Sequence, residues 1–207
     1  SYQIFSIGMN EYADTIKEIF FVFFKAVLIV EKNNNELRVL EGLEKKEGIV
    51  LVKSETSEIE NSNDNTFVAE IHEIKYKIDL LNGQKTGFYL DQAGSRLLIR
   101  KYMNERYKVL DLFCNEGGFA LNAAYSGAKD ITAVDSSEHS IETSKQNAKL
   151  NDFENINFIC KDVFEYMNEV FQTTEKFDFI ILDPPSFTKS KKNLIPALKG
   201  YIELNAK

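Results

Sequence analysis

The sequence predicts an α/β protein, in which a Rossmann-like parallel sheet is preceded by a small α/β domain. Two observations predict this class. From residue 81 onward, short apolar strands alternate with helices, as in a parallel sheet with right-handed crossovers. The strands are continuous apolar runs, typical of a sheet covered on both faces. With 207 residues, 43% of them hydrophobic, the chain has ample material for a core, so wholesale disorder is excluded.

The first part, residues 1–80, is predicted to be the small α/β domain. Its expected elements are strands over 2–6, 27–31, 49–52, 67–72 and 76–80, the last two paired, and one helix over 11–25. In that helix Tyr12, Ile16, Ile19 and Phe23 recur at helical spacing and are expected to face a core. The acidic segment 54–65 is expected to be a mobile surface loop.

The second part, residues 81–207, carries the strand–helix alternation. Its expected strands are 108–112, 131–134, 156–160 and 177–182, and its expected helices are 92–103, 118–126, 138–150, 163–170 and 194–206. The family resemblance given below implies the strand order 3-2-1-4, which leaves strand 177–182 at an edge. An unpaired apolar edge invites strand pairing. We therefore expect that edge to be covered by a second copy, a swapped element or residues of the 1–80 domain.

Charge, cysteine content and hydropathy narrow the function classes. A net charge of −7 argues against a wholly basic nucleic-acid-binding surface but permits a local basic patch. Two cysteines, Cys114 and Cys160, cannot form a four-ligand zinc site alone, so no metal site is predicted. They cannot form a disulfide framework either, which favours a reducing, cytoplasmic setting. The densest apolar run, 19–30, is too short to cross a bilayer, so no membrane partner is predicted.

An aspartate stands at or near the end of each strand of the second part. These residues are Asp111, Asp135, Asp162 and Asp183. Because ligands of open α/β sheets bind beyond the carboxyl ends of the strands, we expect the four carboxylates to share one rim. Helix N-capping is the alternative explanation, and it would account for Asp162 and one other.

The turn over 111–119 indicates which ligand suits this rim. Its adjacent Gly117 and Gly118 do not match a dinucleotide fingerprint, and Glu116 stands where a pyrophosphate would dock. S-adenosylmethionine, which carries positive charge, vicinal hydroxyls and an amine-bearing purine, fits better. Its predicted binding residues are Asp111, Phe113, Gly117 and Gly118 at the methionine end, Asp135 on the ribose, Asp162 and the Val163 amide at the adenine, and Asp183.

The loop after the fourth strand, 183–187, contains two prolines that remove two amide donors and fix an open backbone. Asp183, Pro184 and Pro185 are predicted to position a planar base, and Phe187 to stack on it. The alternative is that the Pro-Pro pair is a loop signal and nothing more.

Four stretches resemble the bacterial PUA-containing 23S ribosomal RNA cytosine-C5 methyltransferases. They are NGQKTGFYLDQ (82–92), VLDLFCNEGGFALNAA (109–124), IILDPPSFTKSK (180–191) and ALKGYIELN (197–205). The resemblance implies an S-adenosylmethionine-dependent methyltransferase domain over 81–207, with the 1–80 domain on the RNA side and ribosomal RNA as partner. It also implies substrate-side roles for Phe88, Tyr89, Gln92, Arg96, Phe187 and Lys189.

The chain departs from that family at several points. Ala93 stands where the family usually has arginine, and the chain is expected to lack the family's N-terminal PUA domain. The family's nucleophilic cysteine is expected beyond Lys207, so the chain is expected to be a C-terminally incomplete fragment that is inactive alone.

No residue of the chain is assigned as the nucleophile. Cytosine-C5 methylation requires a thiolate, yet Cys114 lies in the cofactor turn, Cys160 is expected in the core, and the Ser186 hydroxyl is too weakly acidic. The alternatives are methylation of an exocyclic base amine, and a non-catalytic module that binds cofactor or RNA.

Overall fold

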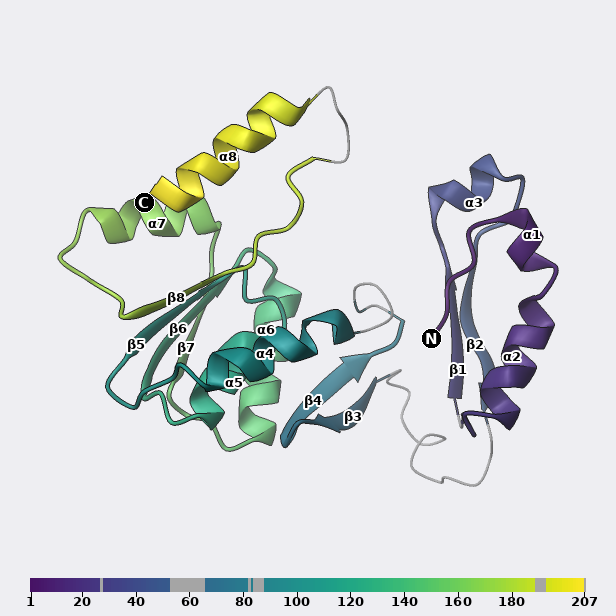
Figure 1. Cartoon of the computed structure of the whole chain (residues 1–207), viewed down its shortest axis with the longest axis horizontal. Helices are drawn as coiled ribbons and strands as arrows, with labels where there is room; N and C mark the ends of the chain where they lie inside the picture. Colours follow the sequence, from purple (N-terminus) through teal and green to yellow (C-terminus); the bar gives the residue numbers. More distant parts are fainter. Residues whose placement is uncertain (27, 53–65, 82, 84–87, 189–192, 207) are drawn as a thin grey trace. The chain divides into compact units, whose positions relative to one another are not determined.

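A computed structural model describes residues 1–26, 28–52, 66–81, 83, 88–188 and 193–206 (Figure 1). The predicted loop 54–65 and Lys189 lie outside these residues. The chain divides into two compact units, one formed by Ser1–Ala69 with Lys77–Asp91 and the other by Glu70–Tyr76 with Gln92–Lys207. Within the described residues, none of the helices combines the length and apolar character that spanning a bilayer requires.

The first unit contains an antiparallel pair of strands, β1 (Leu28–Asn33) and β2 (Lys46–Val52). Its helices are α1 (Ile7–Asn10), α2 (Ala13–Val22) and α3 (Glu36–Leu40). The predicted strand over 2–6 is wrong, since only a single parallel bridge joins Tyr2 to Glu31. The chain turns into α1 instead, where the Ser6 hydroxyl accepts a hydrogen bond from the Met9 amide.

The predicted core-facing stripe of the first long helix is confirmed at Ile16 but wrong at Tyr12, Ile19 and Phe23. Tyr12, Ile19 and Phe23 are 59%, 41% and 78% exposed. The residues that pack against the buried Tyr2, Ile4 and Ile29 include Ala13, Ile16 and Phe20. These follow the same helical spacing on a neighbouring stripe, so periodicity located the helix but not the face that is covered.

Two further strands, β3 (Thr66–Ile71) and β4 (Ile74–Asp79), form the predicted hairpin. Both residues of its turn, His72 and Glu73, have positive φ angles of 51° and 63°. This backbone matches the right-handed twist of the strands it joins. The hairpin end, Glu70–Tyr76, belongs to the second unit.

The second unit confirms the α/β fold class and the predicted strand order. Its parallel strands β5 (Lys108–Leu112), β6 (Asp130–Asp135), β7 (Ile156–Cys160) and β8 (Phe179–Leu182) are arranged β7-β6-β5-β8. A short 3₁₀ turn, η1 (Leu90–Gln92), precedes five α-helices, which are α4 (Ala93–Arg100), α5 (Gly118–Tyr125), α6 (Glu138–Leu150), α7 (Val163–Phe171) and α8 (Leu194–Ala206).

Each face of this sheet has its own core. Val109 packs with residues of α5 and α6, whereas Leu110 and Leu112 pack with residues of α7 and α8 on the other face. Figure 1 shows α7 and α8 on one side of the sheet and α4, α5 and α6 on the other. Because side chains alternate along a strand, Asp111 faces the same side as Val109.

The two edge strands are less covered than their apolar sequences suggest. Cys160, expected in the core, is exposed at the end of β7, because β7 has a neighbouring strand on one side only. In the described part of the chain β8 pairs with β5 alone, and Ile180 is 56% exposed. Coverage of that edge by a second copy stays a prediction.

Candidate active site

The carboxyl ends of the central strands bring three of the predicted aspartates close together. Asp111 lies in β5 in register with Ala133 and Ile181, Asp135 ends β6, and Asp183 follows β8. The charges of Asp135 and Asp183 both raise the pKa of Asp111, as expected for carboxylates that share one rim.

Asp111 is the most deeply buried member, with 1% of its surface exposed. Its Oδ2 accepts a hydrogen bond from the Ala120 amide at 3.0 Å, and its Oδ1 has no hydrogen-bond partner among the described residues. Burial, reinforced by the charge of Asp183, raises the pKa of this carboxyl to about 8. Asp111 is therefore mostly protonated at neutral pH, and its buried Oδ1 is available to a ligand.

Asp135 joins two segments of the rim. Its Oδ2 accepts a hydrogen bond from the Asn115 amide and its Oδ1 accepts one from the Ser137 amide, both at 2.9 Å. The carboxylate therefore holds the turn after β5 and the start of α6 at once. Each oxygen retains a second lone pair that can accept from another donor.

The turn between β5 and α5, residues 113–117, has an unusual backbone. Phe113, Asn115 and Gly117 all have positive φ angles, of 62°, 47° and 78°. Such conformations are costly for residues with a side chain and persist only where neighbouring contacts enforce them. Here the Asn115 carbonyl accepts from the Ser144 hydroxyl at 2.8 Å, in addition to the contact with Asp135.

The two glycines of the turn make room for protein side chains. A Cβ on Gly117 would lie 3.2 Å from Ser144, and one on Gly118 would lie 2.6 Å from Nε of Arg96. Arg96 is 8% exposed, and its guanidinium lies 6.0 Å from the ring centres of both Tyr76 and Phe119. Glycine at 118 is therefore needed to make room for Arg96, which packs here and is buried.

Asp162 serves as the N-cap of α7. Its Oδ1 accepts hydrogen bonds from the Phe164 and Glu165 amides at 2.9 and 3.1 Å. Helix capping, the alternative raised for this residue, therefore accounts for its position after β7. Val163 is buried, with 2% exposed, and packs in the core beneath α7 and α8. The predicted contacts of this pair with adenine stay predictions.

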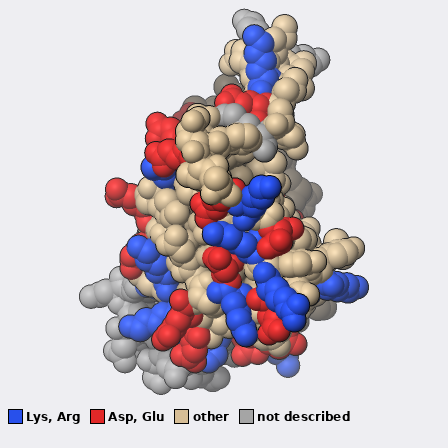
Figure 2. Space-filling view, turned by 90° about the vertical axis from the view of Figure 1, so that its left-hand side faces the viewer, with Lys and Arg blue, Asp and Glu red and all other residues tan. Residues whose placement is uncertain are grey.

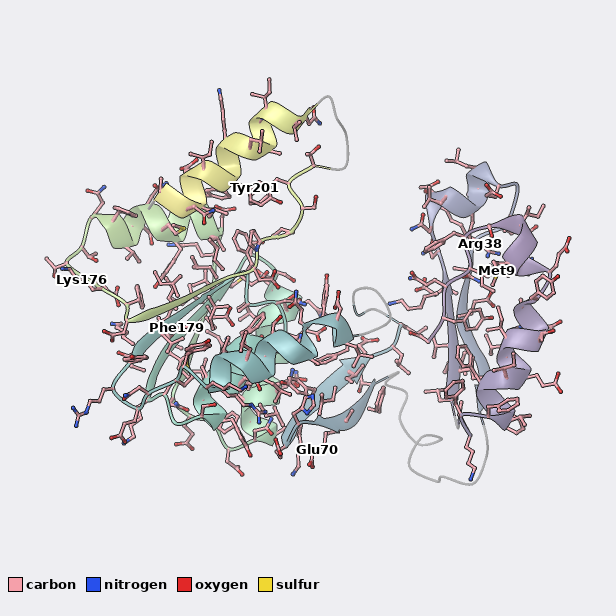
Figure 3. All side chains as sticks on the ribbon, viewed as in Figure 1. Met9, Arg38, Glu70, Lys176, Phe179 and Tyr201 are labelled. Atoms are coloured by element: carbon pink, nitrogen blue, oxygen red, sulfur yellow. The ribbon has the colours of Figure 1, made fainter. Side chains whose placement is uncertain are left out.

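The Pro-Pro loop is held by α8. The Tyr201 hydroxyl donates to the Pro185 carbonyl at 3.3 Å and accepts from the Phe187 amide at 3.5 Å. In Figure 3 Tyr201 projects from α8 toward this loop. Asp183, Pro185 and Ser186 are exposed, whereas Pro184 is half-buried. The role of Tyr201 was not predicted from the sequence. The glycine before it, Gly200, lets the helix approach the loop, since a Cβ there would lie 3.3 Å from Phe187.

Phe187 packs inside an aromatic cluster and does not stand free as a surface for stacking. Its ring centre lies 4.5 Å from that of Tyr201, 5.9 Å from that of Phe164 and 6.4 Å from that of Phe113. The structure therefore does not support the predicted stacking of Phe187 on a base. Its ring instead connects the Pro-Pro loop to the turn after β5 and to α7.

The other predicted substrate-side residues lie in different surroundings. Phe88 is buried and Tyr89 is half-buried, both in the first unit, while Gln92 is half-buried at the start of the second.

In Figure 2 lysine and arginine side chains are interspersed with aspartate and glutamate on the face shown.

Cys114 is buried, and its burial, together with the charges of Asp111 and Asp135, raises the pKa of the thiol well above its usual value. It is therefore a neutral core thiol and not a nucleophile.

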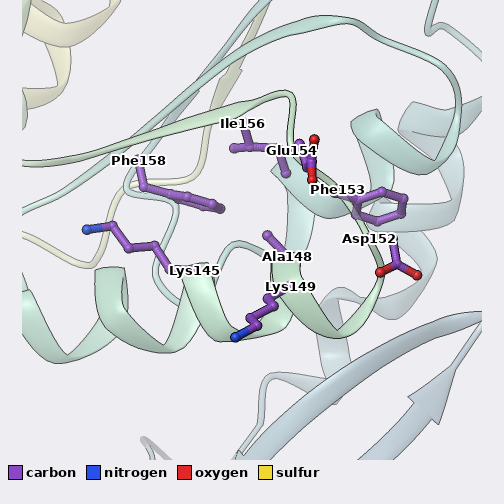
Figure 4. Close-up of a pocket in the computed structure, with 8 residues that line it drawn as sticks. All are labelled: Lys145, Ala148, Lys149, Asp152, Phe153, Glu154, Ile156 and Phe158. Carbon is purple, nitrogen blue, oxygen red and sulfur yellow. The ribbon is translucent and has the colours of Figure 1, made fainter.

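A depression of about 300 Å³ lies where α6 ends and β7 begins (Figure 4). It is lined by Lys145, Ala148, Lys149, Asp152, Phe153, Glu154, Ile156 and Phe158. Since Ile156 is the first residue of β7, this depression lies toward the end of the strand opposite the aspartate rim. It is therefore separate from the site described above.

Comparison with known proteins places this site in a family context. Residues 103–205 match the family described as a methyltransferase domain. Over 205 residues, 98% of this chain and 50% of the relative, the sequence is 36% identical to the ribosomal RNA large subunit methyltransferase I of Aeromonas hydrophila. A Methanocaldococcus jannaschii protein, provisionally named a ribosomal RNA large subunit methyltransferase, is 37% identical over 98% of this chain and 50% of its own length.

The fold is shared with a solved structure. A Streptococcus mutans protein, described as a provisional SAM-dependent methyltransferase, has a TM-score of 0.72 and 24% identity, over 94% of this chain and 50% of its own. The chain spans about half the length of the curated relatives it matches.

Proposed function

We propose that the protein, of which residues 103–205 match a methyltransferase domain, transfers a methyl group from S-adenosylmethionine to a base of large-subunit ribosomal RNA. The names of the two curated relatives support the RNA class. The observation that carries the proposal is that two carboxyl groups lie at one rim. Asp111 is buried, and its Oδ1 has no hydrogen-bond partner among the described residues, while Asp135 accepts a hydrogen bond from the adjoining turn.

These residues fit the chemistry of the cofactor. The methionine end of S-adenosylmethionine carries two positive charges, which suit a buried carboxyl whose Oδ1 has no partner within the described structure. The ribose presents two hydroxyl donors, which suit the remaining lone pairs of Asp135. When bound, S-adenosylmethionine supplies an electrophilic methyl group on its sulfonium.

The protein's own groups hold the reactants. Asp135 accepts from the ribose, and Asp111 faces the methionine end, where a nearby cation favours the ionised carboxylate and so promotes release of its proton. Asp183, at the exposed start of the Pro-Pro loop, accepts from the exocyclic amine of the target base, and Pro184 and Pro185 hold the loop backbone in place.

We propose carbon-5 of cytosine as the methylated atom. This reaction needs a thiolate that adds to carbon-6 and leaves again when the carbon-5 proton is lost, and neither Cys114 nor Cys160 is proposed to supply it. The alternative, methylation of an exocyclic amine, usually relies on an aromatic side chain directly after the prolines. Here that position is Ser186, and Phe187 is engaged by Tyr201 and Phe164. The packing of Phe187 therefore favours the cytosine-C5 reaction.

The test is methyl transfer by the whole protein to large-subunit ribosomal RNA that lacks its modifications, followed by nucleoside analysis. We expect 5-methylcytidine, with the rate reduced at least tenfold by Asp183→Ala and little changed by the exposed control Ser186→Ala. An N-methylated base would contradict the choice of atom. No methylated base at all, with cofactor bound, would support a non-catalytic binding module.

A further inference from the structure

The hairpin end Glu70–Tyr76 contacts the helices that frame the cofactor turn, although it lies outside residues 103–205. Arg100 of α4 holds this end directly. Its Nη2 donates to the His72 carbonyl at 2.5 Å and its Nη1 pairs with Glu73 at 3.0 Å. From Arg100 and the hairpin, hydrogen bonds continue to the turn along two routes.

The first route passes through Asn122 of α5, which is 2% exposed. Its Oδ1 accepts from Nε of Arg100 at 2.7 Å, and its Nδ2 donates to the Tyr76 hydroxyl at 3.0 Å. The same Nδ2 donates to the Gly118 carbonyl at 2.7 Å. A single buried amide thus joins α4, the hairpin and the second glycine of the turn.

The second route passes through the end of α6. Asn151 bonds the backbone of Lys75 twice, accepting from its amide at 2.8 Å and donating to its carbonyl at 2.7 Å. It also donates to the Asn147 carbonyl at 2.7 Å. The fully buried side chain of Asn147 in turn donates to the Glu116 carbonyl at 3.1 Å.

Both routes begin at the hairpin. One ends on the carbonyl of Glu116 within the turn, and the other on the carbonyl of Gly118, the first residue of α5 and the next residue after the turn. We propose that the hairpin end is a positioning element for the cofactor turn, and that Asn122 and Asn151 are positioning residues for S-adenosylmethionine binding. The inference rests on the proposed function, since it requires the turn to bind this cofactor. The turn needs such support because two of its residues that carry side chains, Phe113 and Asn115, have positive φ angles.

The consequence is that changes in the hairpin contacts alter cofactor affinity from a distance. Losing the Asn122 amide leaves the Gly118 carbonyl and the Tyr76 hydroxyl without this donor. Losing the Asn151 amide detaches Lys75 from the end of α6. In both cases the turn samples conformations that do not bind the cofactor. The apparent affinity therefore falls in proportion to the fraction of molecules whose turn can still bind.

The experiment measures the dissociation constant for S-adenosylhomocysteine by calorimetry in the whole protein, together with hydrogen exchange of residues 113–118. We expect Asn122→Ala and Asn151→Ala each to weaken binding about tenfold and to speed exchange in the turn. Tyr76→Phe removes one hydroxyl and keeps the ring, and we expect it to weaken binding about threefold. This milder variant keeps the test informative if an alanine variant does not fold.

The matched control is Asn155→Ala. The half-buried side chain of Asn155 donates to the Ala128 carbonyl, at the connection between α5 and β6 and not at the cofactor turn. We expect this variant to bind with unchanged affinity. If all three test variants fold and bind like the wild type, the positioning role is overturned and the proposed function stands. A folded wild type that binds no S-adenosylhomocysteine overturns the proposed function and the inference together.

Discussion

The turn after β5 and the loop after β8 follow neighbouring parallel strands at the same rim, yet they are held in different ways. In the turn and at the residue after it, carbonyls at 115, 116 and 118 accept hydrogen bonds from side chains of α5 and α6. In the loop, the Tyr201 hydroxyl donates to the Pro185 carbonyl and accepts from the Phe187 amide, and Asp183 is exposed. This difference agrees with our proposal that the turn binds the cofactor and that the loop faces the target base.

The largest expected effect concerns the buried aspartate of the rim. Burial raises the pKa of Asp111 to about 8, so the folded state keeps a proton that the unfolded chain releases near its ordinary pKa of about 4. The stability that this proton provides is present at low pH and is lost as the pH rises through 8. Between pH 5 and pH 8 this loss amounts to up to about 3 kcal/mol.

Asp111→Asn removes the titrating group and should flatten this part of the stability profile. Urea unfolding of both proteins at several pH values measures the difference. If the free energies of unfolding of the wild type and of Asp111→Asn change with pH in parallel, Asp111 is ionised in the folded protein at neutral pH, and the raised pKa is wrong.

The next effect concerns ligand binding at the turn after β5. Asp135→Ala removes the acceptor proposed for the ribose and both backbone contacts of the carboxylate. We expect the affinity for S-adenosylhomocysteine to fall by about 1.5–3 kcal/mol. Titration calorimetry measures this loss, and an unchanged affinity would exclude the ribose assignment.

A smaller effect is expected for the backbone of the turn. Gly117→Ala places a side chain at a φ of 78° and brings a Cβ to 3.2 Å from Ser144. We expect the free energy of unfolding to fall by about 2 kcal/mol. Gly127→Ala is the control for strain alone, because its φ is 95° and nothing lies within 4 Å of its Cβ. Equal losses in the two variants would mean that the contact with Ser144 contributes nothing.

The smallest effect is expected in the loop after β8. Tyr201→Phe keeps the aromatic packing with Phe187 and removes the hydroxyl that bridges Pro185 and Phe187. We expect a loss of about 1 kcal/mol in stability, with faster hydrogen exchange at 183–187 and no change at 113–118. Equal acceleration in both segments would break the contrast between them.

The second unit was predictable because its signals are local. Apolar strands, helical periods and aspartates at strand ends all follow from short stretches of sequence, whereas the strand order, which the structure confirms, rested on the family resemblance. The Asp162 cap was also visible, since Glu165 stands three residues later, as in a capping motif.

Other features could not be predicted because they depend on which surfaces meet. Periodicity places Tyr12 and Ile16 on a helix but does not say which stripe is covered. Arg96 and Phe187 both suggested exposed, substrate-facing roles, yet each is packed against a partner distant in sequence, Gly118 and Tyr201 respectively. The role of Asn122 depends on the position of Tyr76, which is 46 residues away.

The most direct test of the cofactor site is a crystal structure of the whole protein with S-adenosylhomocysteine. We predict one molecule at the carboxyl ends of β5 and β6, with its ribose hydroxyls within hydrogen-bond distance of Asp135 and its methionine end beside Asp111. A molecule bound instead in the depression between the end of α6 and β7 (Figure 4), with the aspartate rim empty, would contradict it.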